Sequence, residues 1–72
     1  MENQELIGRK VKDTKREYKG DVGEVTDIRH FEKANITYAV VKWNKGSKHG
    51  EVYRNYKPKE IGGIFDRFKF IN

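Results

Sequence analysis

Residues 36–43 read Ile36-Thr37-Tyr38-Ala39-Val40-Val41-Lys42-Trp43. Most of these residues are β-branched or aromatic, and such side chains pack well on a pleated sheet. Side chains alternate between the two faces of a strand, so Ala39, Val41 and Trp43 share one face. The run therefore predicts a strand that carries these three side chains into the core.

The next residues form a turn signal, Asn44-Lys45-Gly46-Ser47-Lys48-His49-Gly50. Gly46 and Gly50 can adopt a positive φ at no steric cost, and Asn tolerates it. The segment predicts a mobile, solvated hairpin turn that leads into another strand over residues 51–55.

On the N-terminal side, residues 22–28 have apolar side chains three positions apart, at Val22, Val25 and Ile28. That spacing suits a helix, but Gly23 and the β-branched content oppose one. A β-bulge inserts one residue into a strand and resets its facing, which reconciles the spacing with a strand.

Two further runs, residues 6–12 and 64–71, bring the number of predicted strands to five. Residues 13–21 read as a polar loop, and Pro58 favours a short 3₁₀ turn before the last strand. The expected fold class is all-β, in one domain over residues 1–72 with a flexible N-terminus over residues 1–5. The predicted core consists of Ile7, Val11, Val22, Val25, Ile28, Val41, Trp43, Val52, Ile61, Phe68 and Phe70.

Three segments resemble a known superfamily. Residues 20–28 resemble the Gly-x-Val-x-x-Ile strand of KOW and Tudor-like barrels, and residues 38–46 resemble the Val-x-Trp-x-x-Gly hairpin that follows it. Residues 53–61 are similar to the succeeding strand and turn. The resemblance implies a single five-stranded antiparallel SH3-like barrel with a short 3₁₀ turn before the last strand. In size and in Lys, Ile, Asn and Tyr usage the chain also resembles small orphan proteins encoded by prophages of low-GC bacteria.

Differences between this sequence and the better-known families of this kind argue against several classes of ligand. A peptide-binding SH3 domain needs an aromatic and acidic loop to hold a proline-rich helix, whereas residues 13–21 are basic and contain only Tyr18. A methyl-lysine pocket would hold a cation, which the surrounding positive charge repels. An OB-fold stays a minor alternative, because only seven residues are available for the helix it places between its third and fourth strands.

Composition excludes several classes of protein. The chain has 72 residues and no cysteine, so disulfide scaffolds and thiolate zinc sites are excluded. No apolar run is long enough to cross a bilayer and no secretory signal is present, so we expect a cytoplasmic protein without membrane contact.

The net charge of +5 is unevenly distributed. Residues 9–20 hold six basic and two acidic side chains, and residues 42–59 hold six basic and one acidic. Such blocks fit contact with a polyanion, but lysine-rich turns also keep a small β domain soluble. The candidate nucleic-acid-binding residues are Lys15, Arg16, Tyr18, Lys19, Lys45, Lys48, His49, Tyr53, Arg54, Tyr56 and Lys57.

Catalytic machinery is hard to assemble from this sequence. Ser47 and His49 are two apart in a glycine-flanked turn, and Glu24 and Asp27 fit solvated strand residues. We therefore expect a non-enzyme without metal or cofactor, and a monomer. The leading function is weak, sequence-tolerant binding of nucleic acid through the basic loops. The alternative is a protein-interaction adaptor of phage or prophage origin that uses strand edges and the exposed Phe31.

Overall fold

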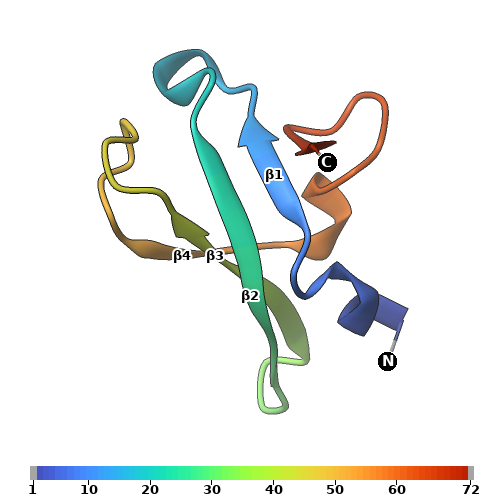
Figure 1. The fold of residues 1–72 in the computed structure, drawn as a ribbon. Helices are drawn as coiled ribbons and strands as arrows, with labels where there is room; N and C mark the ends of the chain where they lie inside the picture. Colours follow the sequence, from blue (N-terminus) through green and yellow to red (C-terminus); the bar gives the residue numbers. More distant parts are fainter. Residues whose placement is uncertain (1, 72) are drawn as a thin grey trace.

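The computed structural model describes residues 2–71, which form one sheet of five antiparallel strands (Figure 1). The strands are β1 (Lys10–Asp13), β2 (Val22–Phe31), β3 (Ile36–Trp43), β4 (Tyr53–Tyr56) and β5 (Phe68–Ile71). Three short 3₁₀ helices accompany them: η1 (Glu2–Leu6), η2 (Arg16–Tyr18) and η3 (Pro58–Glu60). The all-β fold class and the 3₁₀ turn before the last strand are confirmed. None of the helices in residues 2–71 has the length and apolar character needed to cross a membrane.

The sheet has the order β4-β3-β2-β1-β5, so the long β2–β3 hairpin lies at its centre and β4 and β5 lie at its edges. β3 occupies residues 36–43, as predicted. The pairing of β2 with β3 shifts register between Val25 and Asp27, which confirms the β-bulge inferred from the spacing of apolar residues.

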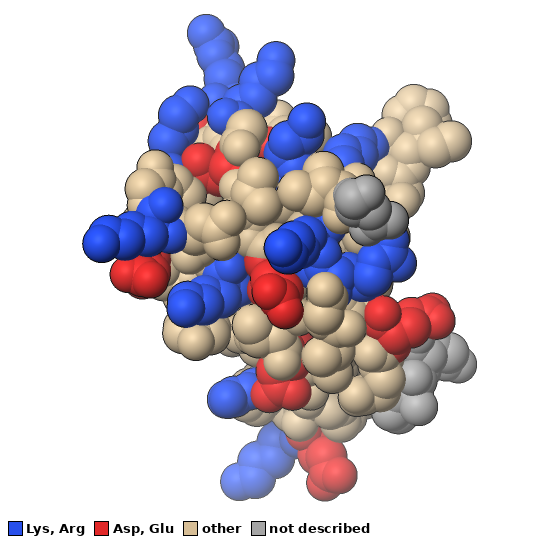
Figure 2. Space-filling model, in the orientation of Figure 1, with Lys and Arg blue, Asp and Glu red and all other residues tan. Residues whose placement is uncertain are grey.

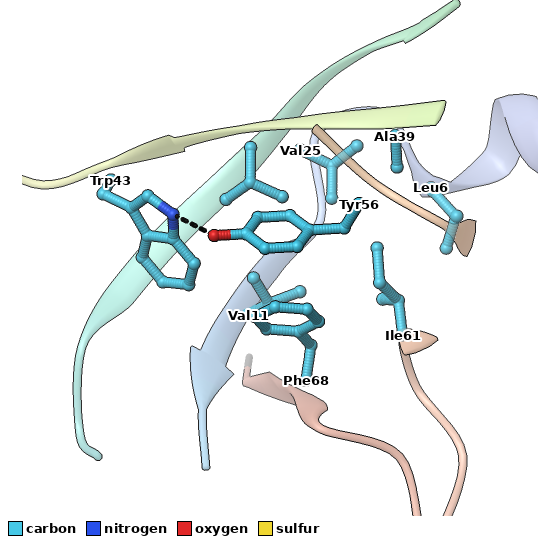
Figure 3. Close-up of a cluster of buried hydrophobic side chains, with 9 residues drawn as sticks. Leu6, Val11, Val25, Ala39, Trp43, Tyr56, Ile61 and Phe68 are labelled. Atoms are coloured by element: carbon cyan, nitrogen blue, oxygen red, sulfur yellow. Dashed lines mark hydrogen bonds between the residues drawn. The ribbon is translucent and has the colours of Figure 1, made fainter. Parts of the chain in front are cut away.

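Apolar side chains from all five strands, η1 and Ile61 form the core, shown in Figure 3. Trp43 lies fully buried, and its indole Nε1 donates a hydrogen bond of 3.0 Å to the Tyr56 hydroxyl oxygen. Tyr56 in turn packs against Phe68, with ring centroids 4.4 Å apart. A side chain at Gly23 would place its Cβ 2.8 Å from the Trp43 ring, so only glycine allows β2 to pass this close to the indole.

The predicted core is wrong at two positions, Ile7 and Val52. Ile7 is 42% exposed and Val52 is 37% exposed, whereas Leu6, next to Ile7, and Tyr56, at the end of β4, are buried. The first regular strand begins only at Lys10, after η1 and a turn through Gly8, so Leu6 and not Ile7 reaches the core. β4 begins at Tyr53, so Val52 belongs to the preceding loop.

The other nine residues of the predicted core are buried or partly buried. Val11, Val25, Val41, Ile61 and Phe68 are buried as predicted. Ile28 and Phe70 are partly buried and pack against the core, and Val22 is half-buried.

The described chain begins with a short 3₁₀ helix and ends with a short strand. Residues 2–5, predicted as part of a flexible N-terminus, lie in η1, and Met1 lies outside the described residues. The last strand begins at Phe68 and not at Ile64, because residues 63–66 form a turn in which the Asp66 amide donates to the Gly63 carbonyl. Ile64 and Phe65 are therefore exposed.

Three loops gather at one end of the sheet, opposite the β2–β3 turn (Figure 1). They are the 14–21 loop between β1 and β2, the 44–52 loop between β3 and β4, and the 62–67 loop before β5. We call this the loop end. It carries the candidate site.

Candidate functional site

A buried carboxylate lies at the centre of the loop end. Asp13, the last residue of β1, is fully buried and accepts four hydrogen bonds. Its Oδ1 accepts from the Lys15 amide and from Arg67 Nε, each at 2.9 Å. Its Oδ2 accepts from Arg67 Nη2 at 2.9 Å and from His49 Nε2 at 2.8 Å. Four donors fill the acceptor positions of a carboxylate, which is what allows this charge to be buried.

A second buried carboxylate anchors the 44–52 loop. Asp21 lies just before β2, and its two oxygens accept from the backbone amides of Lys48 and His49, each at 2.9 Å. Asp13 and Asp21 are also joined directly, because the Asp13 amide donates to the Asp21 carbonyl. We refer to Asp13, Asp21, His49 and Arg67 as the buried network.

Ring stacking fixes His49 from both sides. Its imidazole lies between the Tyr18 ring, 3.7 Å away between centroids, and the Trp43 ring, 4.1 Å away. The two planes deviate from the imidazole plane by 15° and 5°. Tyr18 comes from η2 and Trp43 from the end of β3, so the stack joins the 14–21 loop to the sheet.

The predicted turn over residues 44–50 is solvated at Asn44, Lys45, Gly46 and Lys48, but it is not solvated at His49. Gly46 and Gly50 do have a positive φ, of 89° and 84°, and the turn chemistry is as predicted. The segment is nevertheless tied to β2 through Asp21, and His49 is only 7% exposed.

Within the buried network, the ion pair between Asp13 and Arg67 stabilises the charged form of both groups. Burial alone would raise the pKa of the Asp13 carboxyl, but hydrogen bonds from Arg67 and His49 outweigh it and hold that pKa below its ordinary value of 3.8. The same hydrogen bond to Asp13 raises the pKa of Arg67. Burial raises the pKa of the Tyr56 hydroxyl, so this group stays protonated and able to donate.

Above the buried network lies a hollow of about 170 Å³ that opens to solvent. Six side chains line it: Lys15, Tyr18, His49, Arg54, Tyr56 and Arg67. They come from the 14–21 loop, the 44–52 loop, β4 and the 62–67 loop. We call it the cationic hollow, since three of the six carry a positive charge.

The structure thus brings together five of the eleven residues predicted for nucleic-acid binding, namely Lys15, Tyr18, His49, Arg54 and Tyr56. Lys19 and Lys48 adjoin each other at the same end, with the Lys48 ammonium 3.5 Å from the Lys19 carbonyl oxygen. Figure 2 shows Lys and Arg gathered over the upper part of the face in view, where Figure 1 places the 14–21 and 44–52 loops.

The other four predicted residues do not line the cationic hollow. Arg16 and Lys45 are exposed on the two basic loops. Tyr53 is exposed on β4, with the Lys42 ammonium 5.9 Å from its ring. Lys57 borders a different hollow with Pro58.

Sequence reasoning missed Asp13, Asp21 and Arg67. Apart from the Lys15 amide, the side-chain partners of these residues lie 27 to 54 positions away along the chain, so local patterns do not mark them. The usable signal in the sequence is that the basic segment between β1 and β2 has an acidic residue at each end, Asp13 and Asp21.

The polar groups of the buried network are largely engaged with one another. The oxygens of Asp13 and Asp21 are already occupied by donors, and among residues 2–71 no group of three or more acidic or histidine side chains is arranged to hold a metal ion. Within the same residues, His49 Nδ1 is a buried side-chain atom without a hydrogen-bond partner. The whole His49 side chain is 1% exposed, so neither ring nitrogen is open to solvent.

A second, apolar hollow of about 540 Å³ lies near the β2–β3 turn, at the other end of the molecule. It is lined by Phe31, Ala34, Ile36, Tyr38 and Asn55. Phe31 is 46% exposed, as predicted, and meets Tyr38 edge to face at 5.7 Å.

Comparison with known proteins gave no matching family model, no matching curated protein and no matching solved structure.

Proposed function

We propose that this chain is a non-enzymatic module of SH3-like architecture that binds nucleic acid, with phosphate groups held at the cationic hollow. The strand order and the position of η3 support the architecture. The observation that carries the function is the convergence of Lys15, Arg54 and Arg67 on one hollow from three separate segments.

The charges at the hollow differ in their availability. Arg67 uses Nε and Nη2 on Asp13, so its charge is largely offset there. Lys15 and Arg54 are exposed, and Lys19 and Lys48 lie at the same end. These four exposed cations form the phosphate-binding set, and Arg67 and the Tyr56 hydroxyl supply directional donors.

The size of the hollow fits a phosphate better than a whole small molecule. Pockets for drug-sized ligands have volumes of about 300–1,000 Å³, and the cationic hollow has about 170 Å³. A backbone phosphate with its neighbouring sugar exposed is the kind of group that a shallow, charged hollow accepts without reading sequence.

The salt dependence of oligonucleotide binding tests the proposal. Four phosphates neutralised on a single strand correspond to a slope of log K against log salt of about −3. Changing both Lys15→Gln and Arg54→Gln should bring that slope to about −1.5 and weaken binding strongly at low salt. Fluorescence anisotropy of a labelled single strand and of a labelled duplex, at several salt concentrations, measures both quantities.

A matched control separates a site from net charge. Lys33→Gln with Lys59→Gln removes the same number of positive charges, two, from exposed positions outside the cationic hollow. This pair should leave the slope within about 0.5 of wild type. Equal losses from both pairs, or no binding by the wild type at low salt, would contradict the proposal.

The apolar hollow supports a second candidate function, that of a protein adaptor. Its aromatic lining and the exposed Phe31 would accept an apolar side chain of a partner protein. Such binding would depend little on salt and would be lost in Phe31→Asp, whereas oligonucleotide binding at the loop end would not change.

A further inference from the structure

The 62–67 loop presents two adjacent apolar side chains to solvent. Phe65 is 99% exposed and Ile64 is 83% exposed, the highest values among the large apolar residues of the described chain. Figure 2 shows an uncharged projection at the side where Figure 1 places this loop. We call Ile64 and Phe65 the apolar tip.

The tip is held in place by its own turn. The Asp66 amide donates to the Gly63 carbonyl at 3.1 Å, and the Asp66 carboxylate accepts from the Gly63 amide at 2.8 Å. The Lys69 ammonium donates to the carbonyl oxygens of Gly63 and Ile64. The exposed side chains therefore stand on an organised turn that has a positive charge at its base.

The tip also belongs to the loop end. Arg67, next in the chain after this turn, binds Asp13 and lines the cationic hollow. The Arg67 carbonyl accepts from the Thr14 amide at 3.0 Å and from the Thr14 hydroxyl, which joins the base of the tip to the 14–21 loop. An exposed aromatic ring thus stands on a loop that has the Lys69 ammonium at its base and continues into Arg67, which lines the cationic hollow.

An exposed aromatic ring close to positive charges indicates what kind of partner would use both features. An apolar pocket of another protein would accept the ring but would leave the neighbouring cations without a role. A nucleic acid offers flat π faces and negative charges a few ångströms apart, and both features of the loop end are then used.

We propose that Phe65, supported by Ile64, is a wedge that stacks on a base of the nucleic acid whose phosphates lie at the cationic hollow. The proposal rests on the proposed function and adds to it a defined contact with a nucleobase. Phe65 supplies the stacking face, and Ile64 covers the edge of the same base. The contact is sequence-tolerant, because every base has a π face.

The test compares Phe65→Ala, Phe65→Trp and Phe31→Ala for binding to oligonucleotides that carry 2-aminopurine, single-stranded and duplex. Phe65→Ala should weaken binding about 5- to 140-fold, the range measured for losing one stacked base, with the salt slope unchanged. Phe65→Trp should restore binding, and only variants with a ring at position 65 should quench 2-aminopurine. Phe31→Ala, a change at an exposed ring of the opposite end, should behave as wild type.

The outcomes separate the two proposals. Normal binding by Phe65→Ala with a wild-type salt slope would overturn the wedge and leave the phosphate site standing. A wild type that binds neither oligonucleotide would overturn both. Binding of anionic lipid vesicles that depends on Phe65, without a Phe65 effect on oligonucleotides, would overturn the wedge in favour of a membrane contact. The melting temperature should be unchanged in all variants at position 65, since the ring has no contacts to lose.

Discussion

The two ends of this sheet are stabilised by different means. At the loop end, three loops are joined by buried charged groups, with Asp13 and Asp21 each accepting donors from a distant segment. At the other end, the β2–β3 turn depends on the regular pairing of its strands, with an exposed edge-to-face contact between Phe31 and Tyr38. A small domain has few apolar side chains with which to order its loops. Buried charged groups whose hydrogen bonds are complete can therefore take over this role.

The largest expected effect comes from breaking the buried network. In Asp13→Ala the Arg67 guanidinium and the His49 imidazole lose their acceptor. Removing one partner of a buried ion pair costs about 3–5 kcal/mol, and the partial exposure of Arg67 places this case near the lower value. The total stability of a chain this size is roughly 4–11 kcal/mol, so urea denaturation followed by circular dichroism should show roughly a quarter to three quarters of it lost. A midpoint close to that of wild type would show that the buried network is not needed for folding.

Asp21→Ala should have a smaller effect that is confined to one loop. The Lys48 and His49 amides would lose their acceptors, at a cost of about 1–3 kcal/mol in total. Amide hydrogen exchange should show faster exchange over residues 44–52 than elsewhere. Asp21→Asn, which keeps one acceptor oxygen, should recover part of the loss. Faster exchange spread over the whole sheet would contradict a local role.

Acid should weaken the loop end through Asp13. Because hydrogen bonds hold the pKa of this carboxyl below 3.8 in the folded protein, the unfolded chain binds the proton first. The stabilisation is fully present above pH 4 to 5 and is lost as the pH falls through the folded pKa. Asp13→Asn should lose less stability as the pH falls, because its residue 13 has no carboxyl group to protonate. Parallel stability curves for the two proteins between pH 5 and pH 2 would contradict the assignment.

The smallest effect is expected at the opposite end. Phe31→Ala removes a ring that is 46% exposed and contacts Tyr38 at its edge. The change should cost less than about 1 kcal/mol, which corresponds to only a few degrees in melting temperature. A loss as large as that of Asp13→Ala would remove the contrast between the two ends.

The sequence predicts the centre of this fold well, because the centre has regular periodicity. β3 is rich in β-branched and aromatic residues and is followed by turn residues beyond Trp43, and its bounds were predictable to the residue. The bulge in β2 was predictable because an apolar spacing of three conflicts with Gly23 in a strand. Ile7 and Val52 failed at strand ends, where a shift of one residue moves a side chain to the other face.

The site was predictable only in its exposed part. Basic side chains in two blocks indicated which loops would matter, and five of the predicted residues do line one hollow. The buried network was not predictable, because Asp13 and Asp21 have the local pattern of solvated loop residues and acquire their roles from distant donors. The sequence predicts a strand through the apolar tip, because nothing in Ile64 and Phe65 themselves reveals that Asp66 and Lys69 close a turn beneath them.

Residue-by-residue amide exchange in Asp13→Asn tests the central claim most directly, namely that the buried network joins the two basic loops into one surface. We predict that protection falls together at the Asp21, Lys48 and His49 amides, which belong to both loops, while β2–β3 pairing partners such as Arg29 and Tyr38 keep theirs. Loss of protection in the 14–21 loop alone, with the 44–52 loop unchanged, would contradict the claim.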